Sequence, residues 1–128
     1  MIYNIAILLY DTVASKGRFQ ISKVKISIFN DVENFINKTS QSAGAKIYAN
    51  LKALEEGFRE GIKIKTLRGK IKEIIINRFR VIFFELGGII YVVDVFVKKS
   101  TKTPQRIIKR AERIYNDILE YEKNKSGT

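Results

Sequence analysis

The sequence predicts an α+β fold, an antiparallel sheet with helices packed on it and a terminal helix after the last strand. Two observations support this class. Apolar residues recur at helical spacing between residues 30 and 57 and again after residue 104, whereas residues 71–97 form short runs rich in Ile, Val and Phe. The length of 128 residues suits one domain that covers residues 1–128.

Residues 1–29 predict two strands. The apolar run from Tyr3 to Tyr10 is the first, and residues 24–28 alternate apolar and polar side chains, as a half-buried strand does. The first run follows no basic region and precedes no small-residue cleavage site, so we do not interpret it as a signal peptide.

Two helices are expected next. Asn30 followed three residues later by Glu33 resembles a capping box, which predicts a short helix to about Lys38. Apolar residues then recur at helical spacing over residues 40–56, and Gly57 marks the expected end of this second helix.

Three strands follow, over residues 71–76, 79–86 and 89–97, and they are expected to form a meander. Gly87-Gly88 is a suitable two-residue hairpin turn between the last two. A turn at Asn77-Arg78 separates the first two, because one strand from residue 71 to 86 would be unusually long.

The hairpin turn also predicts a register. If Leu86 pairs with Ile89, Arg80 lies opposite Val95, and alternation then places Arg80, Val95, Val97 and Lys99 on one face.

Pro104 suits the first turn of the terminal helix. The apolar stripe of this helix comprises Ile107, Ile108, Ala111, Ile114, Tyr115, Ile118 and Leu119. Residues 123–128 are predicted to be a frayed, disordered tail.

The positive charge is concentrated in the second half of the chain. Residues 61–128 hold 16 basic and 7 acidic side chains, and contribute +9 of the total net charge of +11. From Lys98 to Arg110 there are six Lys or Arg residues and no acid. Such a field favours a polyanionic partner, either nucleic acid or an acidic protein, and nucleic acid or a ribonucleoprotein is the preferred interpretation.

The composition excludes several kinds of chemistry. The chain has no His and no Cys, which removes the usual general acid–base residue, zinc sites and disulfides. No cluster of carboxylates indicates a magnesium site and no Gly-rich phosphate loop is present, so neither a metal nor a cofactor is expected. No apolar run reaches the roughly 18 residues of a membrane span, and we expect a cytoplasmic protein.

Lys and Arg can nevertheless promote RNA cleavage without metal. The RNA 2′-hydroxyl attacks the adjacent phosphorus, cations stabilise the added charge, and a Lys whose pKa is lowered by neighbouring cations can transfer the proton. The basic side chains before the second predicted strand of this region are Lys63, Lys65, Arg68 and Lys70. They are either part of one concave RNA-binding surface or an ordinary solvated face, and the two interpretations are about equally weighted.

Three segments resemble a known family. Residues 96–104 read F-x-K-K-x-x-K-T-P, residues 67–73 resemble L-x-G-x-x-(aromatic)-E, and residues 79–83 resemble (Y/F)-R-(V/I)-x-(Y/F). Together they resemble the HigB-like, phage-derived branch of the RelE/ParE toxin superfamily over roughly residues 30–119. Residues 1–29 diverge from the family, which usually has one strand there.

The resemblance implies a RelE-like fold and the toxin of a type II toxin–antitoxin system, an endoribonuclease that cleaves mRNA at the ribosome and is neutralised by a cognate helix-turn-helix antitoxin. Carried onto this chain, Arg80, Lys98 and Lys99 are the expected catalytic residues. The expected RNA-binding residues are Lys63, Lys65, Arg68, Lys70, Arg78, Lys102 and Arg106. Ile75 stands where the family has Arg, and Arg78 is a candidate spatial substitute.

The alternative is a non-catalytic protein of the same fold, from a phage or mobile element, that binds a host protein or nucleic acid. Fold does not decide between the two.

Overall fold

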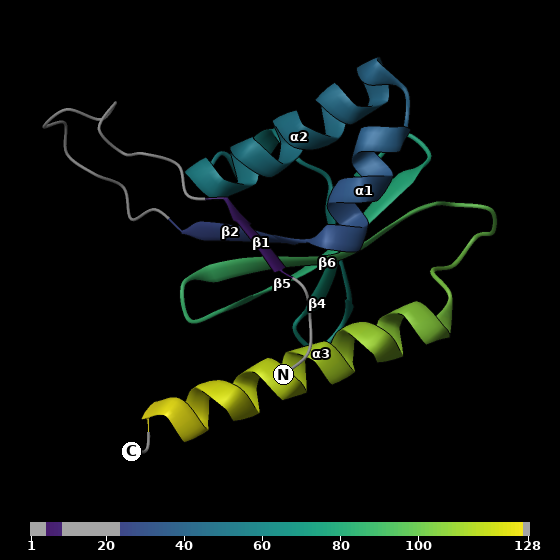
Figure 1. Cartoon of the computed structure of the whole chain (residues 1–128). Helices are drawn as coiled ribbons and strands as arrows, with labels where there is room; N and C mark the ends of the chain where they lie inside the picture. The colour runs from purple at the N-terminus through teal and green to yellow at the C-terminus, as the bar shows by residue number, and fades with distance from the viewer. Residues whose placement is uncertain (1–4, 9–23, 127–128) are drawn as a thin grey trace, which may run out of the picture.

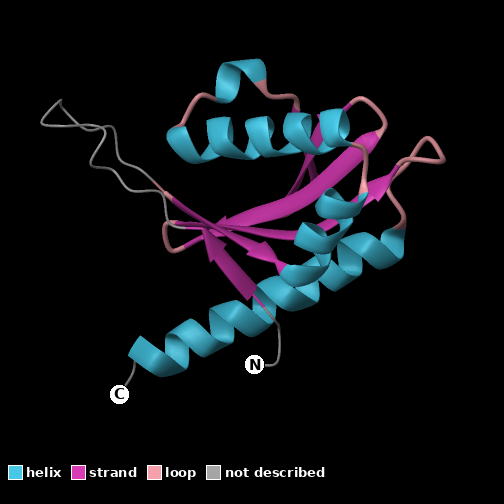
Figure 2. Cartoon of the chain, turned by 45° about the horizontal axis from the view of Figure 1, so that its top comes forward, coloured by secondary structure: helices cyan, strands magenta, loops and turns pink. Residues whose placement is uncertain are grey.

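The computed structural model describes residues 5–8 and 24–126. In this part of the chain one six-stranded sheet separates α1 and α2, on one face, from α3 on the other (Figures 1 and 2). The elements are β1 (Ile5–Leu8), β2 (Lys25–Phe29), α1 (Asn30–Lys38), α2 (Gln41–Glu56), the 3₁₀ turn η2 (Arg59–Gly61), β3 (Ile64–Arg68), β4 (Ile71–Ile76), β5 (Phe79–Leu86), β6 (Ile89–Val97) and α3 (Gln105–Ser126).

The strands lie in the order β1-β2-β6-β5-β4-β3, and all neighbours are antiparallel except β2 and β6. The predicted α+β class, with a terminal helix after the last strand, is confirmed. The meander has four strands rather than three, since β3 precedes it at the edge of the sheet. That strand was missed because its side chains are all exposed or half-buried, so no buried apolar run marks it.

The second strand is buried on both faces, so the predicted half-buried strand is wrong. Residues 26–29 of β2 are all buried, including the polar Ser27. The cause is tertiary, because β2 lies between β1 and β6. Of the first predicted strand only Ile5–Leu8 can be compared, as β1, and the rest lies outside the described residues.

The two helices over residues 30–56 are confirmed, but the capping box is wrong. Asn30 is already helical, Phe29 occupies the N-cap position, and no side chain caps α1. The start of α2 is capped instead, because Ser40 Oγ accepts a hydrogen bond of 3.2 Å from the backbone N of Ala43. Gly57 ends α2 in the left-handed conformation, with φ of 85°.

Strands β4, β5 and β6 have the predicted bounds, and both predicted turns are present. Gly87 and Gly88 have φ of 62° and 78°, the backbone that a tight hairpin turn requires. Asn77 also has a positive φ, of 54°, a conformation that Asn tolerates better than most residues.

The register toward the end of the hairpin differs from the prediction. Leu86 pairs with Ile89 as expected, but an irregularity at Ile82/Phe83 shifts the strands by one residue. Arg80 therefore pairs with Phe96 and not with Val95. Paired residues project from the same face, so Arg80 does not share a face with Val95 and Val97.

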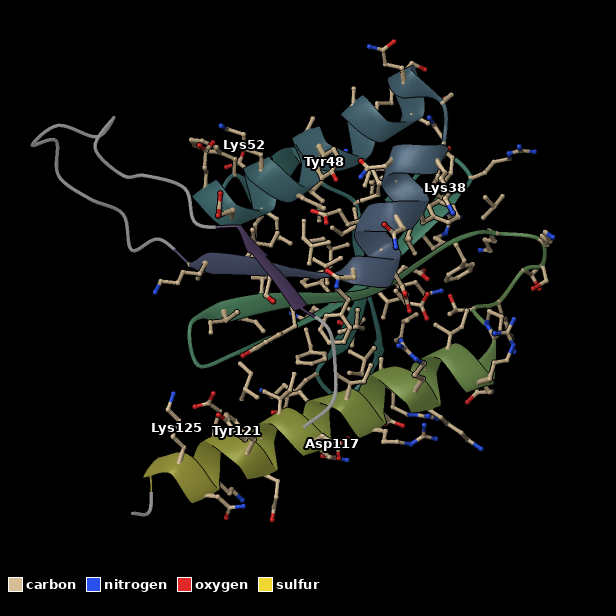
Figure 3. All side chains as sticks on the ribbon, viewed as in Figure 1. Lys38, Tyr48, Lys52, Asp117, Tyr121 and Lys125 are labelled. Carbon is tan, nitrogen blue, oxygen red and sulfur yellow. The ribbon has the colours of Figure 1, made fainter. Side chains whose placement is uncertain are left out.

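Helix α3 packs on the face of the sheet opposite α1 and α2 (Figure 1). Its stripe is buried at Ile107, Ile108, Ala111, Ile114 and Ile118. The helix continues to Ser126, so the tail predicted from residue 123 is wrong for residues 123–126, and residues 127–128 lie outside the described part. Figure 3 labels Asp117, Tyr121 and Lys125 along this last part of the helix.

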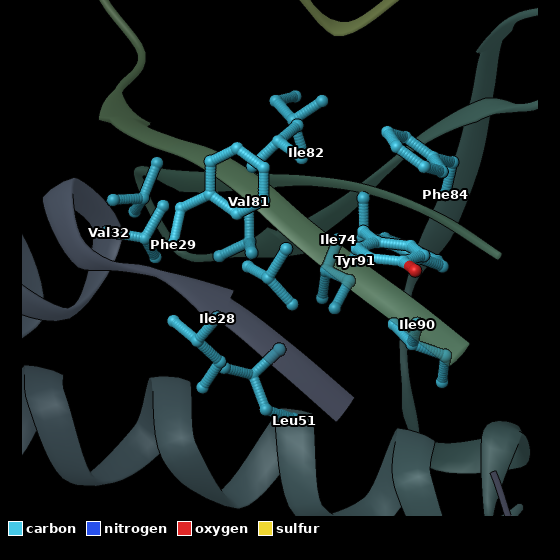
Figure 4. Close-up of a cluster of buried hydrophobic side chains, with 14 of the residues drawn as sticks. Ile28, Phe29, Val32, Leu51, Ile74, Val81, Ile82, Phe84, Ile90 and Tyr91 are labelled. Atoms are coloured by element: carbon cyan, nitrogen blue, oxygen red, sulfur yellow. The ribbon is translucent and has the colours of Figure 1, made fainter. Parts of the chain in front are cut away.

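The core occupies both faces of the sheet (Figure 4). On the α2 side, Leu51 lies against Ile28 of β2. On the α3 side, the ring of Phe84 lies 5.3 Å from Tyr91 and 5.1 Å from Tyr115 of α3, measured between centroids. The contacts of Phe84 with Tyr91 and Tyr115 join β5, β6 and the middle of α3, and the basic junction is the loop between the last two elements.

Candidate nucleic-acid interface

A cleft lies at the junction between β6 and α3. It has a volume of about 430 Å³ and is formed by the end of β6, the following loop, the start of α3 and one residue of α1. The charged residues that line it are Lys99, Lys102 and Arg106, all basic. We call these lining residues the basic cleft. Its apolar wall is formed by Phe35, Val95, Phe96, Val97, Pro104 and Ile107.

Two half-buried aromatic side chains line the basic cleft. Phe35 comes from α1, and its ring packs edge-on against Phe79 of β5, with centroids 6.1 Å apart. Phe96 comes from β6. Cations beside aromatic rings suit single-stranded nucleic acid, whose phosphates meet the cations and whose bases stack on the rings. The place of Phe35 in this cleft was not predicted from the sequence, because it depends on α1 lying beside β6.

A second hollow of about 280 Å³ adjoins the basic cleft and shares Phe35 and Val95 with it. It contains Asp94, whose pKa is raised by burial, while the nearby Arg110 and Arg106 oppose that rise. An Arg110 nitrogen lies 3.8 Å from the Asp94 carboxylate and donates a hydrogen bond of 3.1 Å to the carbonyl of Val93. Arg110 therefore offsets the negative charge of Asp94 beside the basic cleft.

Arg80 does not line the basic cleft. Its side chain is only 9% exposed and donates hydrogen bonds of 2.7 and 2.9 Å to the carbonyls of Asn77 and Phe79. Its Nε lies 4.0 Å from a carboxylate oxygen of buried Glu73, and no hydrogen-bond partner of that Nε is present in the described residues. Arg80 is thus held inside the protein by these contacts.

Glu73 connects Arg80 to the loop. The hydroxyl of Thr103, in the last part of the loop, donates a hydrogen bond of 2.5 Å to the other carboxylate oxygen of Glu73. Both side chains are buried. The contact between Glu73 and Thr103 was not predicted from the sequence, because the two residues are 30 positions apart and only the packing of α3 brings them together.

Lys98 is half-buried and begins the loop. Its backbone N donates a hydrogen bond of 2.7 Å to the carbonyl of Arg78, so the exposed Arg78 turn lies directly beside the loop. Arg78 therefore lies next to Lys98, one of the predicted catalytic residues.

The predicted basic residues on and around β3 divide into two groups. Arg68 is engaged, because its guanidinium donates to both carboxylate oxygens of Glu112, at 2.7 and 3.0 Å, and to Gln105 at 3.2 Å. This bond lowers the pKa of Glu112 and raises that of Arg68. Arg68 therefore ties the edge strand to α3.

Lys63, Lys65 and Lys70 are exposed. Lys65 pairs with Glu73, so it projects from the same sheet face as Arg80, whose partner on β4 is Ile75. Lys63 adjoins that position, since its carbonyl accepts a hydrogen bond of 2.9 Å from the N of Ile75. These contacts bring Lys63 and Lys65 beside Ile75, where the family pattern places an Arg.

The predicted residues therefore fall into three sets. Lys99, Lys102 and Arg106 line the basic cleft, with Lys98 and Arg78 next to each other at its loop. Lys65 lies on β3, Lys63 directly precedes that strand, and Lys70 lies in the turn that follows it. Arg68 and Arg80 are engaged in contacts within the protein.

Within the described residues, no group of three or more Asp or Glu side chains is arranged to hold a metal ion. No helix in this part of the chain combines the length and apolar composition that a membrane span requires.

Comparison with known proteins gives a family. No curated protein matches the chain significantly. The family model of the phage-derived Gp49-like proteins matches residues 34–116, which run from α1 into α3 and include the entire basic junction. The Gp49-like proteins are a RelE/ParE-like toxin family. With most of its length matched, the chain belongs to the phage-derived Gp49-like family.

Proposed function

We propose that this protein is the toxin of a type II toxin–antitoxin system, of the HigB-like branch, and that it cleaves mRNA at the ribosome without a metal ion. A cognate helix-turn-helix antitoxin would neutralise it, and both would act in the cytoplasm. The observation that supports this best is the basic cleft, in which every charged lining residue is a cation and two aromatic rings lie beside them. Family membership supports the toxin-like class.

The cations of the junction suit cleavage by the RNA's own 2′-hydroxyl. As that oxygen attacks phosphorus, negative charge builds on the phosphoryl oxygens, which Lys102 and Arg106 would stabilise. Arg does not lose its proton near neutral pH, so Lys98 or Lys99 would take the proton of the 2′-hydroxyl and give a proton to the departing 5′-oxygen. The bond from phosphorus to the 5′-oxygen breaks, leaving a 2′,3′-cyclic phosphate and a free 5′-hydroxyl.

The test is RNA cleavage by purified protein, with and without ribosomes, in EDTA and after magnesium is restored. Controls with substrate and magnesium but no protein exclude background cleavage. We expect cleavage of isolated RNA to persist in EDTA. If cleavage takes place only on the ribosome, we expect EDTA to stop it because the ribosome itself requires magnesium. Products that carry 5′-phosphates, or cleavage of isolated RNA that EDTA abolishes, would overturn the mechanism.

A second candidate function is a non-catalytic protein of this family that binds nucleic acid or a host protein. Two observations favour it: Ile75 replaces the family Arg, and Arg80 is withdrawn from the surface by Glu73 and two carbonyls. Induced expression separates the candidates, because an active toxin arrests growth. Soluble protein that causes no growth defect would favour the binding protein.

A further inference from the structure

The loop that carries the basic residues is attached to the sheet at both ends. At its start, the backbone N of Lys98 donates to the carbonyl of Arg78 at 2.7 Å. At its end, the hydroxyl of Thr103 donates to Glu73 at 2.5 Å. Between these two attachments, residues 99–102 are exposed.

Arg80 joins the two attachments. One of its terminal nitrogens donates to the carbonyls of Asn77 and Phe79, which flank Arg78 in the turn that receives Lys98. Its Nε faces the carboxylate of Glu73 at 4.0 Å, and Glu73 receives Thr103. The chain of contacts therefore runs from one end of the loop to the other through two buried, oppositely charged side chains.

Such burial requires a physical reason. Glu73 is 2% exposed and Arg80 is 9% exposed, and charged groups are rarely buried this far unless they are paired. An apolar pair would fill the same space at no desolvation cost, so stability alone does not account for the charges. Their contacts instead specify one position for the loop.

We propose that Glu73, Arg80 and Thr103 are positioning residues that hold the loop of residues 98–103 against the sheet, and so set where Lys99 and Lys102 stand in the basic cleft. Arg80 acts through Glu73 and the Asn77–Phe79 turn and does not touch RNA. The proposal rests on the proposed function only for its consequence for RNA, because the anchoring itself is a property of the folded protein.

The test removes one hydroxyl. Thr103→Val keeps the shape of the side chain but leaves Glu73 without its donor, whereas Thr103→Ser keeps the donor. Thr101→Val is the matched control, since it removes an exposed hydroxyl from the same loop. Amide hydrogen exchange is measured across the chain, with amides of α2 as the reporter of global unfolding.

We expect Thr103→Val to speed exchange about tenfold at the loop amide of Lys98, which is hydrogen-bonded to Arg78, while α2 is unchanged. Tenfold is the order of effect of one unsatisfied buried group. Thr103→Ser and Thr101→Val should resemble the parent protein. In a binding assay with single-stranded RNA, only Thr103→Val should weaken the affinity, by about threefold to tenfold.

Exchange in the loop that is equal in Thr103→Val and Thr101→Val would overturn the proposal. So would faster exchange in the loop with RNA affinity equal to that of the parent protein, because the loop position would then not matter for binding. If the exchange results are as expected but even the parent protein fails to bind RNA, the anchoring stands and the proposed function fails.

Discussion

Arg80 carries a permanent positive charge in a nearly buried position. Two backbone carbonyls accept its hydrogen bonds, and Glu73 lies at 4.0 Å with an opposite charge. Removal of Arg80 leaves the Glu73 carboxylate buried, and within the described residues the Thr103 hydroxyl remains as its hydrogen-bond donor. The consequence for folding is therefore larger than for an exposed Arg on the same hairpin.

Arg80→Ala should lower the free energy of unfolding by about 3 kcal/mol, the order of effect of breaking a buried ion pair. Urea denaturation measures it. The matched control is Arg78→Ala, two residues away and exposed, which should stay within about 0.5 kcal/mol of the parent protein. Equal urea midpoints for both variants would show that the Glu73–Arg80 contact does not stabilise the folded protein.

The residue motifs predicted the location of the basic junction, but the predicted face of Arg80 was wrong. The strand pattern over residues 79–83 placed Arg80 correctly on β5. Its surroundings were not predictable, because one irregularity at Ile82/Phe83 changes the partner of Arg80 from Val95 to Phe96. A single extra residue in a strand leaves no clear mark on the apolar pattern, yet it exchanges the two faces of the sheet.

At the scale of elements, α3 is the piece that completes the site. Its buried stripe packs on the sheet, and its first turn supplies Arg106 and Ile107 to the basic cleft. The position of the cleft thus depends on apolar contacts further along the same helix, among which Ile114 is fully buried.

Ile114→Asp should destabilise the protein by about 4 kcal/mol or more, because it removes a buried apolar side chain and buries a carboxylate without a partner. Thermal denaturation followed by circular dichroism gives the result. Asn116→Ala, at an exposed position of the same helix, serves as the control and should melt near the parent protein. An unchanged melting temperature for Ile114→Asp would contradict the packing of α3.

The ion pair between β3 and α3 gives a pH dependence. Arg68 lowers the pKa of Glu112 in the folded protein, so ionised Glu112 favours folding. That contribution is present above the ordinary Glu pKa of about 4.3 and is lost as the pH falls through the lowered folded value. The side chains of Arg68 and Glu112 are 42% and 38% exposed, so solvent screens the pair and the effect is small.

Glu112→Gln should therefore be less stable than the parent protein at pH 7, and the difference should shrink as the pH falls below the ordinary Glu pKa of about 4.3. Urea unfolding of both proteins across this range measures it. Glu120→Gln, which removes an exposed charge from the same helix, should show no such trend. A stability difference for Glu112→Gln that grows toward acid pH would contradict the assignment.

Elements with a strong apolar pattern were predictable, and those shaped by their neighbours were not. The bounds of β4, β5 and β6 followed from their Ile, Val and Phe runs and from Gly87-Gly88. By contrast, β3 is an edge strand with exposed Lys and Arg, and its sequence resembles a loop. The last turns of α3 were also not predicted, because their side chains are mostly polar and exposed.

At the scale of the whole molecule, the charge is unevenly distributed. The net charge of +11 comes mainly from residues 61–128, and the fold brings part of that charge to the junction of β6 and α3. The three cations that line the cleft, Lys99, Lys102 and Arg106, were all among the candidate residues taken from the sequence. It did not predict Phe35, because a residue of α1 meets β6 only through the parallel pairing of β2 with β6.

The salt dependence of RNA binding tests most directly the central claim that the basic cleft is the RNA contact. Each phosphate that a cation neutralises releases counterions, and contributes about 0.7 to the slope of log affinity against log salt for a single strand. Lys99→Ala with Lys102→Ala should therefore reduce the slope by about 1.4 and weaken binding at low salt. The matched control, Lys38→Ala with Lys46→Ala, removes two exposed cations from α1 and α2 and should leave the slope nearly unchanged. An equal reduction in both double variants, or none in the first, would contradict the claim.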